Sequence, residues 1–230
     1  MKKTIGKLIY PVLLLGFVII LSNNCKKDDS SNASTAITDY DGNVYHSVTI
    51  GTQTWMVENL KTTHYNDGTA IPNVTDATAW GALTTPGYCW YNNDVTNKAT
   101  YGALYNWYAA SNSLLCPSGW HVPTDAEWTT LTTFLGGSSV AGGKLKESGT
   151  AHWITPNTGA DNSSGFTALP GGSHYSNGLY YLNGQYGWWW STTASSSTQV
   201  WHVYMQNSTT VLSRTSAAMN LGFSVRCIKD

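Results

Sequence analysis

The stretch from Val44 to Leu60 constrains the fold most strongly, because its side chains follow the two-residue period of a β-strand. Residues 51–53 read as a turn, and TWMVENL follows with Trp55 and Val57 on one face. Before the turn, alternate positions carry Val44, His46, Val48 and Ile50. Two alternating segments joined by a short turn predict an antiparallel hairpin with one buried face.

The segment DYDGN at residues 39–43 fits two interpretations. Its alternating oxygen-bearing side chains resemble a calcium loop, but the glycine comes too early and no Glu closes the loop. An Asp-Gly turn before a strand explains the same residues. The cysteines form no Cys-x-x-Cys pair and no Cys/His cluster with zinc spacing. We therefore expect a turn here, and neither a metal nor another cofactor in the protein.

The segment CPSGWHVPTDAEW at residues 116–128 could be a reactive site or a piece of framework. Thr124 and Glu127 have the spacing of a capping box, in which each side chain binds the other residue's backbone N–H. Asp125 then lies in the first helical turn, where the helix dipole favours a negative charge. The end of the segment therefore predicts a helix start, while His121 has no assigned role.

Helical patterns are confined to the middle of the chain. The predicted helix after Thr124 ends at Gly136-Gly137, and a shorter candidate covers residues 140–147. YGALYNWYAAS at residues 101–111 also reads as helical, with Leu104, Tyr105, Tyr108 and Ala109 on one face. The stripe expected to be buried in the helix after Thr124 consists of Trp128, Leu131 and Leu135.

The last third of the chain returns to strands between polar turns. The candidate strand segments are residues 165–175, 185–193, 198–206 and 221–230. A hairpin, then helices, then strands is typical of an α+β domain with helices clustered in the sequence.

The N-terminus has the pattern of a secretory signal. Lys2, Lys3 and Lys7 precede an apolar run at residues 8–21, which is short for a membrane span; a short anchor helix is the alternative. The following LSNNCKKDDS resembles a bacterial lipoprotein signal, which implies cleavage after residue 24 and acylation of Cys25. Acyl chains would anchor the protein to a membrane.

The organisation expected from this pattern is a signal peptide at 1–24, a flexible tether at 25–37 and one domain at 38–230. Lys27-Asp28-Asp29 resembles the signal by which Bacteroidota send lipoproteins to the cell surface, so the expected location is the outer membrane, facing outward. Without residues 1–24 the chain has nine basic and thirteen acidic residues, a net charge of −4. There is no basic stripe, and nucleic acid is not an expected partner.

Several motifs together resemble one known family. In order, they are IGTQTWMVENL, GYCWYNND, YGALYNWYAA, CPSGWHVPTDAEW, GFTALPGG, WWWSTT and GFSVRCIKD. They resemble the Fibrobacter succinogenes major paralogous domain over roughly residues 38–230. VPTDAEW and GFSVRC are more distantly similar to the formylglycine-generating, sulfatase-modifying enzymes, whose domain has a C-type-lectin-like fold.

The resemblance implies a C-type-lectin-like α+β domain with twisted antiparallel sheets, two helices and long loops. The first and last strands of such a domain pair. The resemblance also implies a disulfide between Cys116 and Cys227, with Cys89 left over. The oxidase chemistry of the distant relatives needs a Cys pair near the C-terminus, where this chain has Cys227 alone.

The first functional hypothesis is a non-catalytic binding or adhesion module for a glycan or a surface protein. The chain has 11 Trp and 14 Tyr, and exposed rings of these residues suit such ligands. Adjacent strand residues face opposite sides, so at most two of three consecutive Trp share a face; the alternative is that they fill the core. The candidate ligand contacts are Tyr175, Tyr180, Tyr181, Tyr186, Trp188, Trp189 and Trp190.

Two other functional classes remain open. A hydrolase would need two carboxylates facing one cleft, and Glu58 with Asp67 or Asp94 is the available choice. A nucleophile formed by Cys89 and a histidine is a further alternative, whereas the G-x-S-x-G motif of serine hydrolases is absent. A structural surface protein without a small ligand is the third class. Exposure of aromatics would favour binding, and a pocket with paired carboxylates, or with Cys89 beside a His, would favour catalysis.

Overall fold

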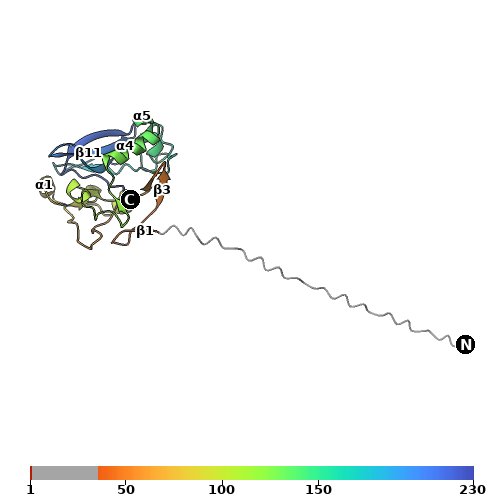
Figure 1. Ribbon diagram of the computed structural model, residues 1–230, viewed down its shortest axis with the longest axis horizontal. Coiled ribbons are helices and arrows are strands. Elements are labelled where there is room, and N and C mark those ends of the chain that lie inside the picture. Colours follow the sequence, from red (N-terminus) through yellow and green to blue (C-terminus); the bar gives the residue numbers. More distant parts are fainter. Residues whose placement is uncertain (2–35) are drawn as a thin grey trace. The chain divides into compact units, whose positions relative to one another are not determined.

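The structure is a computed structural model that describes Met1 and residues 36–230 (Figure 1). Residues 36–230 form one compact unit. The predicted cleavage site, Cys25 and most of the tether lie outside the described residues. Within the described part, no helix is long and apolar enough to cross a membrane.

The unit is mixed α+β, with several small antiparallel sheets and two main helices. Its helices are α1 (Ala77–Gly81), η1 (Tyr91–Asn93), α2 (Asn97–Tyr101), α3 (Trp107–Ala110), α4 (Asp125–Phe134) and α5 (Ser138–Leu145). Its strands are β1 (Ile37–Thr38), β2 (Val44–Tyr45), β3 (Ser47–Ile50), β4 (Gln53–Met56), β5 (Tyr88–Cys89), β6 (Leu104–Tyr105), β7 (Trp120–His121), β8 (Ser173–His174), β9 (Tyr180–Tyr181), β10 (Tyr186–Ala194), β11 (Gln199–Gln206), β12 (Ser213–Ala218) and β13 (Ile228–Lys229).

The predicted hairpin is present as β3 and β4. Ile50 pairs with Gln53 across a two-residue turn, in which Gly51 has a φ of 64° that favours glycine. The predicted alternation is wrong at its start, where Val44 is 48% exposed and Tyr45 is buried. Tyr45 turns inward because its hydroxyl donates to Asp39 Oδ2 at 2.5 Å. Asp39 thus belongs to a turn, as expected.

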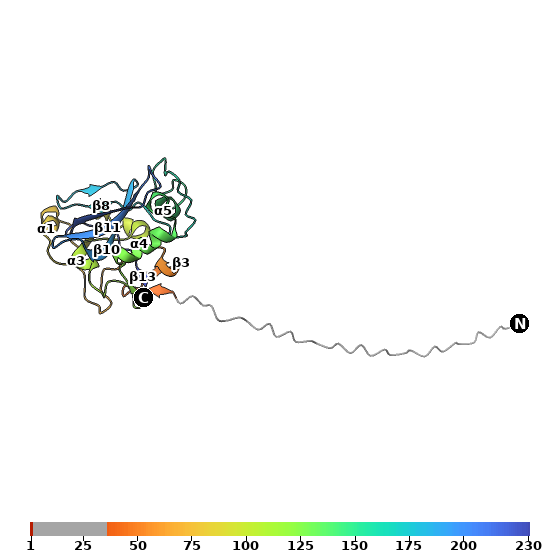
Figure 2. The same ribbon diagram turned by 45° about the horizontal axis from the view of Figure 1, so that its top comes forward.

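The helix after Thr124 is confirmed as α4, including its capping box. Thr124 Oγ1 accepts from the Glu127 N–H, and Glu127 Oε2 accepts from the Thr124 N–H at 2.7 Å. Figure 2 shows α4 and α5 close together beside the sheet that contains β10 and β11. The predicted stripe is buried, and it joins a core cluster that includes Trp55 and Phe166.

The predicted helix at residues 101–111 is wrong. Leu104 and Tyr105 form strand β6, and only the single turn α3 follows. Asn106 ends the strand and caps α3, because its Oδ1 accepts from the Ala109 N–H at 3.0 Å. Tyr105 exchanges two backbone hydrogen bonds with Phe223, which holds this segment extended.

The strands of the last third are only partly as predicted. Residues 185–193 and 198–206 correspond to β10 and β11, whereas 165–175 and 221–230 contain only the short strands β8 and β13. Strand β12 was missed because its small and polar residues carry no apolar alternation.

The sheet β10-β11-β12 separates two cores. Trp188 pairs with Tyr204 and Trp190 with His202, so these side chains share a face, whereas Trp189 points the other way. Trp188 and Trp190 pack in one apolar cluster and Trp189 in the other. The expectation that at most two of the three Trp share a side is confirmed.

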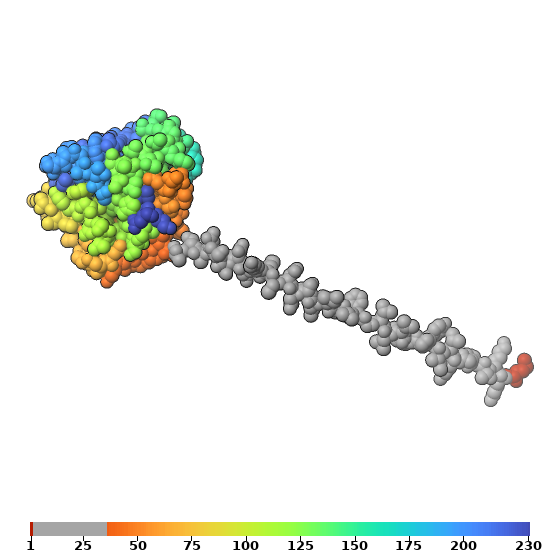
Figure 3. All heavy atoms as spheres, in the orientation of Figure 1, coloured from red at the N-terminus to blue at the C-terminus, as the bar shows by residue number. Residues whose placement is uncertain are grey.

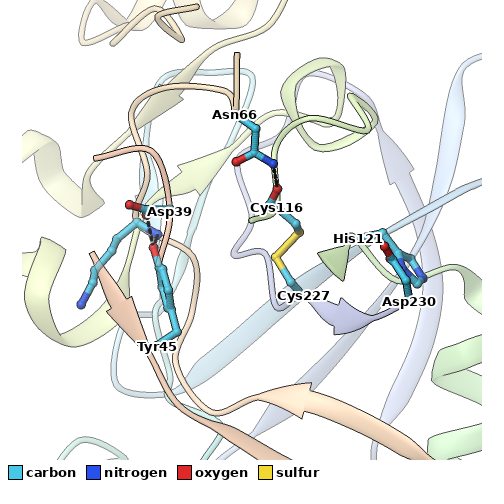
Figure 4. Close-up of a disulfide and its surroundings, with 8 residues drawn as sticks. Asp39, Tyr45, Asn66, Cys116, His121, Cys227 and Asp230 are labelled. Atoms are coloured by element: carbon cyan, nitrogen blue, oxygen red, sulfur yellow. Dashed lines mark hydrogen bonds and ion pairs between the residues drawn. A yellow bond between two sulfur atoms is a disulfide. The ribbon is translucent and has the colours of Figure 1, made fainter. Parts of the chain in front are cut away.

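The C-terminal end is bound into the N-terminal half of the unit. Strand β13 lies between β4 and β7, with Ile228 opposite both Trp55 and His121. In Figure 3 the C-terminal end lies beside the hairpin coloured orange. Cys116 and Cys227 form the disulfide implied by the resemblance, across 111 residues of sequence (Figure 4). Closing so long a loop stabilises the fold by about 4 to 5 kcal/mol on the loop-entropy estimate.

His121 joins the C-terminus to the start of α4 (Figure 4). Its Nδ1 lies 2.7 Å from Asp230 Oδ1, and its Nε2 lies 2.9 Å from Glu127 Oε1. Partial burial alone would lower the pKa of His121, but the hydrogen bonds to these two carboxylates outweigh burial and raise the pKa. The residue that had no role in the sequence pattern is therefore a connecting ion-pair residue.

Arg226 is fully buried and binds backbone carbonyls in place of a carboxylate partner. Its guanidinium donates to the carbonyls of Met56, Val57 and Phe166 and to Asn59 Oδ1. The guanidinium carbon also lies 4.3 Å from the centre of the Phe166 ring. Burial lowers the pKa of Arg226 to about 9, so the group remains charged at neutral pH.

Asn59 connects this arginine to the central sheet. Its Oδ1 also accepts from Trp189 Nε1 at 2.9 Å, and its Nδ2 donates to the Tyr101 carbonyl and to Ser224 Oγ. One buried amide thus ties together the segment after β4, strand β10 and the C-terminal segment.

Lys146 is a second buried cation that is satisfied by carbonyls. Its ammonium donates to Thr158, Gln206 and Thr209, which uses all three of its N–H donors. Burial lowers the pKa of Lys146 to about 8. The ammonium fixes the loop after α5 to the end of β11.

We expect Arg226→Leu to lower the free energy of unfolding by about 3 to 5 kcal/mol, because three backbone carbonyls and Asn59 Oδ1 lose the guanidinium as a donor. Urea unfolding would measure the change. Arg214→Leu is the matched control: Arg214 is an exposed arginine that pairs with Asp125 at 2.5 Å, and its loss should cost about 1 kcal/mol or less. Equal costs for the two variants would contradict the central role of Arg226.

The His121 ion pairs should give the stability a pH dependence. The pKa of His121 is raised in the folded protein, so its contribution is complete below about pH 6.5 and is lost as the pH rises through the folded pKa. The pKa of Glu127 is lowered, so its contribution is complete above about pH 4.3 and is lost as the pH falls through the folded pKa.

We therefore expect His121→Gln to destabilise the protein more at about pH 5.5 than at about pH 8.5, by up to about 1 kcal/mol for this partly exposed group. Urea unfolding of both proteins at the two pH values would measure the difference. Asp230→Asn should reproduce part of it. A His121→Gln effect that is equal at both pH values, or larger at the higher one, would show that the ion pairs do not stabilise the fold.

Candidate ligand-binding site

One face of the sheet β10-β11-β12 carries an open hollow of about 410 Å³. Alternate residues of each strand face it, because side chains two positions apart lie on one side of a sheet. The volume is at the lower end of the range of small-molecule sites. The hollow is lined by Tyr175, Leu182, Tyr186, Trp188, His202, Tyr204, Thr215, Ser216, Ala217, Leu221 and Phe223.

Four of the lining rings form a nearly parallel series. Tyr186 lies over Trp188 with ring centres 5.0 Å apart and planes 12° apart, and Trp188 continues to Phe223 at 6.0 Å and 13°. Tyr204 extends the series beyond Tyr186, at 6.2 Å and 30°. Phe223 is buried in the core, whereas Tyr186 and Tyr204 are half-buried. The series therefore leads from the interior to the surface.

The lining also has polar groups, but no formal charge. His202 is 4% exposed, and burial lowers its pKa to about 4, so its imidazole is neutral at physiological pH. Its Nδ1 is buried without a hydrogen-bond partner among the described residues. Thr215 adds a hydroxyl group, whereas the hydroxyl of Ser216 donates to Gln199 Oε1 on the other face of the sheet.

The structure brings three of the predicted ligand contacts together and separates the others. Tyr175, Tyr186 and Trp188 line the hollow. Trp189 and Trp190 are fully buried, which corrects their assignment as ligand contacts. Both can fill the core because their indole N–H groups have internal acceptors. Trp189 donates to Asn59 Oδ1, and Trp190 donates to the Tyr105 carbonyl.

The two remaining tyrosines lie on β9, outside the lining of the hollow. Tyr180 stacks on His174 at 4.1 Å and donates its hydroxyl to Asn93. Tyr181 packs edge-on against Tyr175 at 4.9 Å and so supports the rim. The hollow therefore does not bring these two half-buried tyrosines together with the other predicted contacts.

Sequence reasoning missed the other eight residues of the hollow, among them His202, Tyr204, Thr215 and Phe223. The alternation within residues 198–206 does place His202 and Tyr204 on one face. What the pattern could not supply is the register that sets Tyr204 opposite Trp188 and Thr215 opposite His202.

Cys89 does lie beside a histidine, but in the interior. Its Sγ is 3.3 Å from His174 Nδ1, and both residues are buried. Burial raises the pKa of Cys89 to about 12 and lowers the pKa of His174 to about 4. A nucleophilic pair requires the opposite shifts, toward thiolate and imidazolium. Trp80 and Tyr180 also pack against the imidazole, at 4.4 Å and 4.1 Å.

The carboxylates considered for hydrolysis have separate local partners. Glu58 Oε1 lies 2.6 Å from His46 Nδ1. Asp67 and Asp94 each accept from a threonine N–H two residues later. In the described part of the chain, no group of three or more His, Cys, Asp or Glu side chains is placed to hold a metal ion.

The described residues thus form an α+β domain with an aromatic-lined hollow on its three-stranded sheet. The sequence model of the Fibrobacter succinogenes major domain matches residues 48–229. The chain therefore belongs to this family, as its motifs indicated. Comparisons with curated proteins and with solved structures give no significant match.

We expect Cys89 to resist alkylation by iodoacetamide in the folded protein at about pH 8, because the thiol is buried and protonated. Peptide mass mapping would measure modification of this residue before and after urea unfolding, with the disulfide kept intact. The unfolded chain is the control and should react fully. Rapid modification in the folded state would restore the Cys89–His174 pair as a candidate nucleophile.

Proposed function

We propose that this protein is a lipid-anchored, non-catalytic binding module of the bacterial outer surface, with a carbohydrate as its ligand. The observation that carries the proposal is the series of near-parallel rings that reaches the surface at the hollow. The apolar face of a sugar ring stacks on such aromatic faces, while hydroxyl groups at the edge bind the sugar hydroxyls.

The location rests on the sequence. The basic residues, apolar run and Cys25 of the N-terminal segment support a lipid anchor, and Lys27-Asp28-Asp29 supports export to the cell surface. A membrane would therefore be one partner, through the lipid, and a glycan the other.

The finer fold that we propose is C-type-lectin-like. Pairing of β13 with β4 joins the two ends of the domain, as the resemblance requires. The Cys116–Cys227 bridge fastens the same region. The analogy adds weight to binding, but the site itself is argued from the hollow.

Catalysis is disfavoured by the state of its candidate groups. Cys89 and His174 are held neutral in the interior, and Glu58 is hydrogen-bonded to His46. A structural surface protein without a small ligand is the second candidate, and it is an outcome of the following test.

We expect the full chain to bind polysaccharides saturably, and Tyr186→Ala to weaken this binding by roughly tenfold or more because it removes one of the two half-buried stacking rings. A glycan array followed by titration calorimetry would measure the affinities. Tyr40→Ala, at a tyrosine that is 57% exposed and lies outside the hollow, is the matched control and should bind like the wild type.

Two results would count against the proposal. Absence of binding to every glycan would favour the structural role. Binding that survives Tyr186→Ala would place the site away from the hollow.

A further inference from the structure

We propose that the hollow is selective for uncharged sugar rings and excludes sulfated and uronic-acid polysaccharides. This inference rests on the proposed binding function and adds the ligand class. Two observations support it. The lining has no charged side chain, and the nearby Arg214 is paired with Asp125.

The residues that line the hollow include no Asp, Glu, Lys or Arg. The two polar side chains that accompany the rings on this face, at His202 and Thr215, are uncharged at neutral pH. A sulfate or carboxylate that entered would lose water without gaining a cationic partner, which is a large cost. A neutral sugar carries only hydroxyl groups, whose hydrogen bonds these side chains can replace.

The one cation on strand β12 is turned away from the hollow. Arg214 precedes Thr215, so it faces the opposite side of the sheet. There its Nε and Nη2 donate to both oxygens of Asp125, at 2.5 and 2.7 Å. Its guanidinium carbon also lies 3.5 Å from the centre of the Trp201 ring. An anionic ligand in the hollow therefore cannot use this charge.

The ring series gives the positive part of the selectivity. Tyr186 and Tyr204 are half-buried at the outer end of the series, and a ring face exposed there suits the flat C–H face of a pyranose. Stacking of this kind is not screened by salt, in contrast to recognition of an anionic polymer. Binding by the hollow should therefore be insensitive to ionic strength.

The test uses the full chain and matched pairs of polymers. Curdlan, xylan, mannan and galactan are each titrated beside their own sulfated derivatives, at about 50 mM and about 500 mM NaCl. We expect at least one neutral polymer to bind with the same affinity at both salt concentrations. Its sulfated derivative should bind at least about tenfold more weakly.

Two variants on the exposed rim test the cause of the exclusion. Thr215→Lys places a cation at the hollow and should raise the affinity for the sulfated derivative about tenfold or more, in a salt-dependent manner. Thr215→Gln is the matched neutral substitution: it changes the affinity for both polymers through the lost hydroxyl, but it should not raise the ratio of sulfated to neutral binding. An unchanged preference in Thr215→Lys would overturn a charge-based selection.

The remaining outcomes separate this inference from the proposed function. Equal or tighter binding of sulfated polymers by the wild type, weakened by salt, would overturn the neutral ligand class. If Tyr186→Ala also removed that binding, the proposed function would stand. Absence of binding to all eight polymers and to the array would overturn both.

Discussion

The fold depends on one buried cation that acceptors from two separate segments must solvate. Arg226 in the C-terminal segment reaches the carbonyls at the end of β4 and that of Phe166, and Asn59 accepts from it and from Trp189. A guanidinium without water needs every one of these acceptors, so the segments cannot move apart separately. Two further links join the C-terminal segment to the rest of the domain next to Arg226. They are the pairing of β13 with β4 and the Cys116–Cys227 bridge.

This junction explains why the central sheet can be covered on both faces. Trp189 is drawn to one side by Asn59, which leaves Trp188 and Trp190 on the other. The candidate site is the continuation of that second core: Phe223 and Trp188 belong to the buried cluster, and Tyr186 and Tyr204 carry the same ring series outward. The rings are already packed against one another there, so a ligand that stacks on them would find the surface formed before it binds.

Much of the local structure could be predicted where it depends on a few neighbouring residues. The Thr124–Glu127 capping box and the glycine pair after α4 act within one turn of helix, so their reading was correct. The helix predicted at residues 101–111 is wrong because the helical spacing of these residues competes with backbone hydrogen bonds to Phe223. That residue lies more than 110 positions further along the chain. His121 had no visible role for the same reason, since Asp230 lies 109 positions further along the chain.

The class of the fold, the start of α4, the turn between β3 and β4 and, through its motifs, the family could all be read from the amino-acid sequence. These features follow from periodicity and caps, which act over short stretches of chain. The burial of particular tryptophans, the contact between neutral Cys89 and His174, and the hollow itself became visible in the three-dimensional packing. Each of these depends on strand register and on packing between distant segments, and a shift of one residue would exchange the faces of Trp188 and Trp189.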